Sequence, residues 1–326
     1  MKSKLFTYKI IIPICIIFAA LTAFSFWAHS AVVVPRLEKM EYDKEFGIHG
    51  TEDGLFLINV IDDGNGKKHG ILSLFDGGYY GIQEAYIPSR YDGINITVIE
   101  EDSFSEFDCL EKVVIPQSDI TTIEKKAFKN TINLKEIYIP SNVTDISSDA
   151  FYNCKNFTMY VEEGSYAEKF AVENNIKYEY YTPQPPEQKN TDYSKAKRGY
   201  HYNDFNYDVL YYKDEPFCAI SYNPMGNDTD LKVPAYIDNI KVTTLSEYAF
   251  NDCSVETITL PDTVTTVCSR AFSCGSLTKV YFTKSVSYID KSAFENSPDV
   301  VMCVPKDSYA YKYAIEHNIK FEEINN

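Results

Sequence analysis

The stretch that decides the fold is IPSNVTDISSDAFYNC, residues Ile139 to Cys154. It carries two anchors, an apolar residue before proline at its start and a small residue before phenylalanine near its end. Both anchors recur along the chain, the second at spacings of 22 to 24 residues. The first recurs as Ile87-Pro88, Ile115-Pro116, Val233-Pro234 and Leu260-Pro261, and the second as Ser103-Phe104, Ala127-Phe128, Ala249-Phe250, Ala271-Phe272 and Ala293-Phe294. Self-similarity at this period is typical of a solenoid, in which each turn buries the apolar edge of its neighbour.

The residues of one turn predict its conformation. Ile137 and Ile139 alternate with polar neighbours, which is the period of a half-buried strand. Pro140 has no N–H for the ladder and ends that strand. Val143 and Ile146 are expected to point inward, and Ala150-Phe151 to plug the convex side from a short helical turn. The predicted fold is a β-rich α/β solenoid of parallel strands with short convex helical turns.

Two segments are expected to cap the solenoid turns. Ser165 precedes Ala167, Phe170 and Ala171, which share one helical face, and the whole segment recurs from Ser308 at an offset of 143 residues. A cap inside the chain predicts two separate solenoid modules rather than one long solenoid. The expected parts are a signal anchor or signal peptide (1–31), a stalk (32–45), module 1 (46–181), a linker (182–199) and module 2 (200–326).

Module 1 is expected to open with hairpin strands. Apolar residues alternate from Phe56 to Val60 and again from Ile71 to Leu74, on either side of the turn Asp62-Asp63-Gly64-Asn65-Gly66. The acidic turn lacks the spaced ligands and the late glutamate of a calcium loop, so a tight turn is the favoured interpretation.

The N-terminus predicts export from the cytoplasm. Three lysines precede an uncharged apolar run from Ile10 to Trp27, which as a helix is ~27 Å long and nearly spans a bilayer. An uncleaved membrane anchor is favoured over a cleaved signal peptide, although Ala28 and Ser30 fit the small-residue positions of a cleavage site. Both interpretations place the rest of the chain outside the cytoplasm.

Composition argues against several classes of function. The chain has 47 acidic and 31 basic residues, a formal charge of -16, and lacks the basic face that nucleic-acid binding needs. The five histidines do not pair at ligand spacing, and no phosphate loop, nucleophile elbow or Cys-x-x-Cys motif is present. We therefore expect no catalytic residues, no metal and no cofactor. Seven cysteines lie beyond the apolar run; Cys268 and Cys274 flank one plug and either bridge or, as favoured, stay buried free thiols.

These residues together resemble the BspA-like, or Treponema pallidum-type, leucine-rich repeats. The resemblance rests on the Ile-Pro strand end, Val143-Thr144-Asp145-Ile146, the Ala-Phe plug and Asn153-Cys154, and it covers about residues 80 to 181 and 225 to 324. Thr283 in place of the strand-end proline and Ser103 in place of alanine depart from the pattern. The resemblance implies a surface-exposed or secreted protein used in adhesion or in binding host or matrix components, and it implies no catalytic residues.

The residue just before each strand end is expected to face outward on the strand face. That column is Tyr86, Val114, Tyr138 and Tyr160 in module 1, and Lys232, Thr259, Tyr281 and Cys303 in module 2. Tyrosine offers contact area and a hydroxyl at low entropic cost, although it also simply suits sheets. The candidate ligand-binding residues are Tyr86, Lys112, Glu136, Tyr138, Tyr160, Lys279 and Tyr281. An extracellular protein or glycan is the expected partner, and a non-catalytic envelope spacer is the alternative function.

Overall fold

A computed structural model describes residues 48–51, 53–62, 64–183, 197–213, 215–223, 228–251 and 253–325. The predicted signal or anchor segment (1–31) and stalk (32–45) lie outside the described residues. Neither α3 (Tyr166–Glu173) nor α4 (Tyr309–Glu316), the α-helices of the described part of the chain, is long and apolar enough to cross a membrane.

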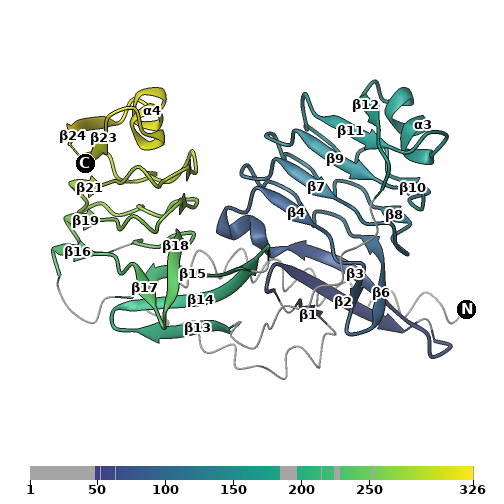
Figure 1. Cartoon of the computed structure of the whole chain (residues 1–326), viewed down its shortest axis with the longest axis horizontal. Coiled ribbons are helices and arrows are strands. Elements are labelled where there is room, and N and C mark those ends of the chain that lie inside the picture. The colour runs from purple at the N-terminus through teal and green to yellow at the C-terminus, as the bar shows by residue number, and fades with distance from the viewer. Residues whose placement is uncertain are drawn as a thin grey trace, which may run out of the picture. The chain divides into compact units, whose positions relative to one another are not determined.

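The first array of strands, residues 48–183, consists of two sheets (Figure 1). One sheet starts with antiparallel strands and continues with parallel ones, in the order β1 (Ile48–Gly50), β2 (Phe56–Asp62), β3 (Lys68–Phe75), β6 (Ile94–Ile99), β8 (Thr122–Ile123) and β10 (Asp145–Ile146), with β5 (Arg90–Tyr91) beside β6. The 3-10 helix η1 (Asp76–Tyr80) follows β3. The other sheet is parallel throughout, in the order β4 (Glu84–Tyr86), β7 (Lys112–Val114), β9 (Glu136–Ile139), β11 (Thr158–Val161) and β12 (Lys177–Tyr180).

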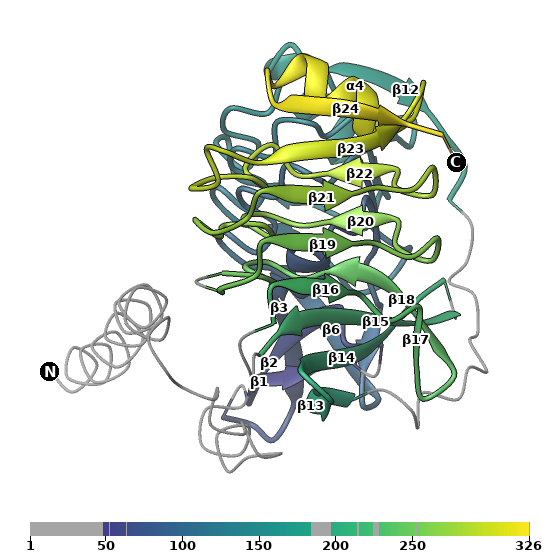
Figure 2. The same ribbon diagram turned by 90° about the vertical axis from the view of Figure 1, so that its left-hand side faces the viewer.

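The second array, residues 197–325, repeats this arrangement, and Figure 2 shows its strands stacked one above another. Its first sheet runs β13 (Lys197–Tyr202), β14 (Phe205–Tyr212), β15 (Glu215–Tyr222), β18 (Ile240–Leu245), β20 (Thr266–Val267) and β22 (Tyr288–Ile289), with β17 (Tyr236–Ile237) beside β18. Its second runs β16 (Asp230–Lys232), β19 (Thr257–Thr259), β21 (Lys279–Tyr281), β23 (Val301–Pro305) and β24 (Lys320–Ile324). The strand β13 begins inside the segment predicted as linker, because Lys197 already pairs with Val209 of β14.

The predicted opening hairpin is confirmed. The strands β2 and β3 pair antiparallel from Phe56↔Phe75 to Asp62↔Lys68. The Asp62 carboxylate accepts the backbone N–H groups of Gly64 and Gly66 at 2.9 and 3.2 Å, and both glycines have positive φ, 83° and 80°. The acidic side chain therefore closes its own tight turn.

The core of the first array is a column of phenylalanines, one from each turn. The ring centroids of Phe104 and Phe128 lie 4.8 Å apart, and those of Phe128 and Phe151 lie 5.1 Å apart. Ala127 and Ala150 are fully buried beside them, and Val143 and Ile146 point inward as predicted. The cluster also contains Leu210, Phe217 and Ala219 from β14 and β15. A parallel column, Phe250, Phe272 and Phe294, lies in the second array.

The plug segments are single hydrogen-bonded turns, in keeping with the short helical turns that the sequence predicted. Ala150 and Tyr152 donate backbone hydrogen bonds to residues three before them, at 2.9 and 3.0 Å. Asn153 then adopts a left-handed conformation, with φ of 61°. A right-handed helix cannot continue through such a residue, so the chain leaves the turn toward the next strand.

The helices α3 and α4 follow the last turn of each array. Ser165 accepts the backbone N–H of Glu168 at 3.2 Å, and Ser308 accepts that of Tyr311 at 3.1 Å. Ser165 is therefore the N-cap of α3, as predicted. The buried face of α3 is Ala167, Phe170 and Ala171, also as predicted, and that of α4 is Ala310, Tyr313 and Ala314.

Candidate functional site

Parallel pairing aligns the predicted outward residues of the first array in one row. Tyr86 pairs with Val114, Val114 with Tyr138, and Tyr138 with Tyr160. We call these four residues the tyrosine column. The alternate residues Ala85, Val113, Ile137 and Met159 are buried, whereas Tyr86 is 44% exposed and the other three members of the column are half-buried. The strand period thus places the column on the open face of the sheet.

One end of the column is a stack of two rings. The centroids of Tyr138 and Tyr160 lie 4.4 Å apart and their planes differ by 6°. Tyr181 meets Tyr138 edge-on at 5.3 Å. The two stacked rings cover one face of each other, which leaves their other faces, their edges and their hydroxyl groups for further contacts.

Lys112 and Glu136 lie beside this stack. The Lys112 ammonium lies 5.1 Å from the centroid of the Tyr138 ring and 3.7 Å from the Glu136 carboxylate. The Tyr138 hydroxyl donates to the same carboxylate at 3.1 Å. Three of the predicted site residues therefore form one charged and aromatic cluster across β7 and β9.

Tyr86 forms a similar arrangement at the other end of the column. Its hydroxyl donates to the Glu84 carboxylate at 2.7 Å, and Lys213 lies 3.1 Å from that carboxylate and 5.9 Å from the Tyr86 ring centroid. Glu84 stands two residues before Tyr86, just as Glu136 stands two before Tyr138. The sequence pattern Glu-x-Tyr therefore contained a signal for Glu84. Nothing local in the sequence pointed to Lys213 or Tyr181.

The hydroxyl groups of Tyr138 and Tyr86 stay protonated at neutral pH. Partial burial and then the hydrogen bond to Glu136 raise the pKa of Tyr138 to about 12. Partial burial and the bond to Glu84 raise the pKa of Tyr86 to about 12 in the same way. Each phenol thus remains neutral, with its proton held by a carboxylate.

In the second array, the predicted residues Lys279, Tyr281 and Cys303 are partly buried, paired or covered by their neighbours. Tyr281 is half-buried on β21, and Lys279 on the same strand bridges to Glu322 of β24 at 2.9 Å. Cys303, which the sequence placed in the outward column, is only 1% exposed. It is a short side chain between Tyr281 and Glu322 on the neighbouring strands, and its thiol lies 3.9 Å from the Glu322 carboxylate. Larger neighbours therefore cover it, and the expected exposure is wrong.

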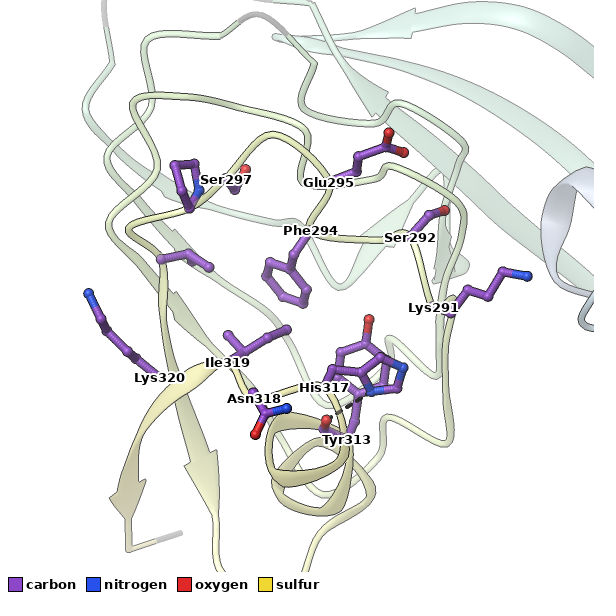
Figure 3. Close-up of a pocket in the computed structure, with 12 residues that line it drawn as sticks. Lys291, Ser292, Phe294, Glu295, Ser297, Tyr313, His317, Asn318, Ile319 and Lys320 are labelled. Atoms are coloured by element: carbon purple, nitrogen blue, oxygen red, sulfur yellow. Dashed lines mark hydrogen bonds between the residues drawn. The ribbon is translucent and has the colours of Figure 1, made fainter.

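A separate pocket of about 550 Å³ lies beside the last turn of the second array (Figure 3). Phe294, Tyr313 and Ile319 point into it, and the Nδ1 of His317 lies 3.0 Å from the Tyr313 carbonyl oxygen. The corresponding place in the first array is filled by Phe157, whose ring lies 5.2 Å from Phe151. Val300 takes the place of Phe157 in the second array, so the pocket follows from a smaller core residue. Among the described residues, no group of three or more His, Cys, Asp or Glu is arranged to hold a metal ion.

Two comparisons relate the chain to known proteins. A family model described as "BspA type Leucine rich repeat region" matches six copies over residues 82–164 and 234–321, more than half of the chain. Similar solved structures include a leucine-rich repeat protein of T. pallidum (15% identity, covering 85% of this chain and 100% of that chain, TM-score 0.30). They also include one from Bacteroides ovatus (15%, 82% and 98%, 0.23) and the pneumococcal vaccine antigen PcpA (11%, 86% and 99%, 0.24). No curated protein matches. The chain is a member of the BspA-type leucine-rich repeat family.

Proposed function

We propose that this protein is an extracytoplasmic, cell-surface binding or adhesion protein that recognises a protein or glycan through its strand faces. The observation that supports this is the tyrosine column, an aromatic row on an open parallel sheet with lysine and glutamate beside it. Such a row offers contact area and hydrogen-bonding groups held in place by the sheet. The apolar run Ile10–Trp27 would attach the protein to the membrane as an uncleaved anchor, or direct its secretion as a cleaved signal.

The proposed architecture is two modules, each covered at its end by a helix. The helices α3 and α4 bury matching apolar faces against the last turn of each array, which protects an edge that every solenoid otherwise leaves open. The strand faces then serve binding, and the protein has no catalytic role.

A change of all three column tyrosines tests the binding face. Tyr86→Ser, Tyr138→Ser and Tyr160→Ser, combined in the full chain, should reduce capture of a bound extracellular-matrix protein or glycan at least tenfold, because the aromatic contact area is removed. The measurement is binding of the detergent-solubilised chain to a panel of immobilised extracellular-matrix proteins and glycans.

The matched control changes three exposed tyrosines that lie outside this sheet face: Tyr152, Tyr166 and Tyr236, which are 59%, 38% and 52% exposed. The control should bind as the wild type does. Equal capture by the column variant and the wild type would refute the proposed face.

A spacer or structural role in the envelope is the second candidate. It is favoured by the fact that the charges beside the column already satisfy one another, as Lys112 with Glu136 and Lys213 with Glu84. Such pairs leave fewer groups for a ligand. The spacer role would be supported if the wild-type chain captured none of the proteins and glycans in the panel.

A further inference from the structure

Cys253 and Cys274 lie against each other in the core of the second array. Their sulfur atoms are 3.0 Å apart, and the side chains are 7% and 0% exposed. They belong to neighbouring turns of the solenoid, 21 residues apart in the chain. The sequence singled out Cys268 as a possible partner of Cys274, but the structure brings Cys253 to that position instead.

The stacking of the turns gives the spacing that a disulfide requires. The backbone N–H of Phe250 donates to the carbonyl of Ala271 at 2.8 Å, and β19 pairs in parallel register with β21 (Figure 1). Neighbouring strands lie about 4.7–4.9 Å apart, and disulfide-linked residues have Cα atoms about 4.4–6.8 Å apart. Bond formation then needs the two sulfur atoms to approach by only about 1 Å.

Cys274 occupies a position that holds a hydrogen-bonding side chain in other turns. Its carbonyl accepts the N–H of Leu277 at 3.1 Å, as the carbonyl of Thr131 accepts that of Leu134 at 3.2 Å. The Thr131 hydroxyl donates to the Phe104 carbonyl at 2.7 Å, back toward the preceding turn. The Cys274 sulfur also points back, and lies 3.1 Å from the Cys253 carbonyl oxygen. In this turn the Cys274 sulfur also contacts the thiol of Cys253.

The contact also favours the reactive form of one sulfur. The hydrogen bond from the Cys253 thiol lowers the pKa of Cys274, and the same contact, followed by burial, raises the pKa of Cys253. A thiolate is the species that attacks a disulfide, so this contact helps one of the two sulfur atoms to react.

We propose that Cys253 and Cys274 form a disulfide that links two turns of the second array. The oxidant is a disulfide donor of the thiol–disulfide exchange class, either a protein disulfide or glutathione disulfide. One of the two cysteines, as its thiolate, attacks one donor sulfur, which forms a mixed disulfide and releases the other donor sulfur as a thiol. The sulfur of the other cysteine then attacks the cysteine sulfur of the mixed disulfide, and the second donor sulfur leaves. Two thiol protons and two electrons pass to the donor, which ends as two thiols. This inference does not rest on the proposed binding function.

Mass spectrometry of the full chain tests the proposal. The chain is produced in cells with an oxidising cytoplasm, denatured in iodoacetamide to block every free thiol, and digested with trypsin and a glutamate-specific protease. Cleavage at Arg270 separates Cys268 from Cys274, and cleavage at Glu256 separates Cys253 from Cys268. The expected product is a Cys253–Cys274 cross-linked peptide that disappears on reduction. Alkylation of both residues, or a cross-link of either to another cysteine, would overturn the proposal.

Variants supply a matched control. Cys268→Ala should retain the cross-link, whereas Cys253→Ala should lose it and leave Cys274 alkylated. A reductant should lower the Tm of the wild type and of Cys268→Ala by on the order of 5 °C, and leave that of Cys253→Ala unchanged. If a variant fails to fold, the presence or absence of the Cys253–Cys274 cross-link in the wild-type chain still tests the proposal.

Discussion

Individual side chains decide what the open sheet face presents. Tyr138 and Tyr160 stack because parallel strands place equivalent residues directly beside each other. The stack hides one face of each of these two rings. Under the proposed function, a ligand at the stack would meet the remaining faces and edges, the hydroxyl groups and the lysine–glutamate pair beside them.

Glu136→Gln is predicted to lower the pKa of Tyr138 from about 12 toward its ordinary value of 10.0. Removal of the negative charge makes the phenolate less unfavourable, while the partial burial remains. NMR of the labelled tyrosine ring as a function of pH measures the change. Glu84→Gln is the matched control, which should lower the pKa of Tyr86 and leave Tyr138 near 12. An unaltered Tyr138 pKa in Glu136→Gln would contradict the assigned hydrogen bond.

At the scale of elements, the final turns of the two arrays differ at the buried residue that precedes the strand. Phe157 precedes β11 and packs on Phe151, whereas Val300 precedes β23 and leaves a pocket beside Phe294. Both residues are nearly buried, 6% and 3% exposed. The last turn of the first array is therefore packed more completely than its counterpart.

Val300→Phe is predicted to stabilise the protein by about 1 kcal/mol, because the pocket accepts the added ring and buries its apolar surface. The reverse change, Phe157→Val, should cost about 2 kcal/mol through the cavity it leaves. Urea unfolding measures both. A loss of stability in Val300→Phe would show that the pocket walls cannot accommodate the ring.

At the scale of the whole molecule, the described residues separate into two hydrophobic clusters. One cluster contains the column Phe104, Phe128 and Phe151, and the other contains Phe250 and Phe272. Each turn packs mainly on its neighbours, which makes stability a sum of turns and of the contacts between adjacent turns. A substitution that weakens one turn should therefore destabilise the adjacent turns first.

Phe128→Ala is predicted to destabilise the first array by roughly 3–5 kcal/mol, because it removes a ring that stacks on both sides. Amide hydrogen exchange should become faster in β8, β9, β10 and β11, and stay at the wild-type rate in β19, β21 and β23. Uniformly faster exchange in both arrays would argue against the proposed division into two modules.

Much of the fold and of the site was predictable from the chain alone. Several sequence features act within one turn or between adjacent turns. They are the repeat period, the alternation within Glu136–Ile139, the cap at Ser165 and the Ala-Phe plugs. Such short-range patterns are visible in the sequence, and they were enough to predict the solenoid and the row of Tyr86, Tyr138 and Tyr160.

The remaining features were decided by the tertiary structure. Lys213 reaches Glu84 from the turn after β14, more than a hundred residues away in the chain. Cys303 is covered by its neighbours on two other strands, and Cys274 meets Cys253 rather than Cys268. The repeat period does not specify any of these contacts, because each depends on the offset between turns and on side-chain sizes in neighbouring strands. The sequence by itself determined the turns and the directions of their side chains, and the packed structure determined which of those side chains touch.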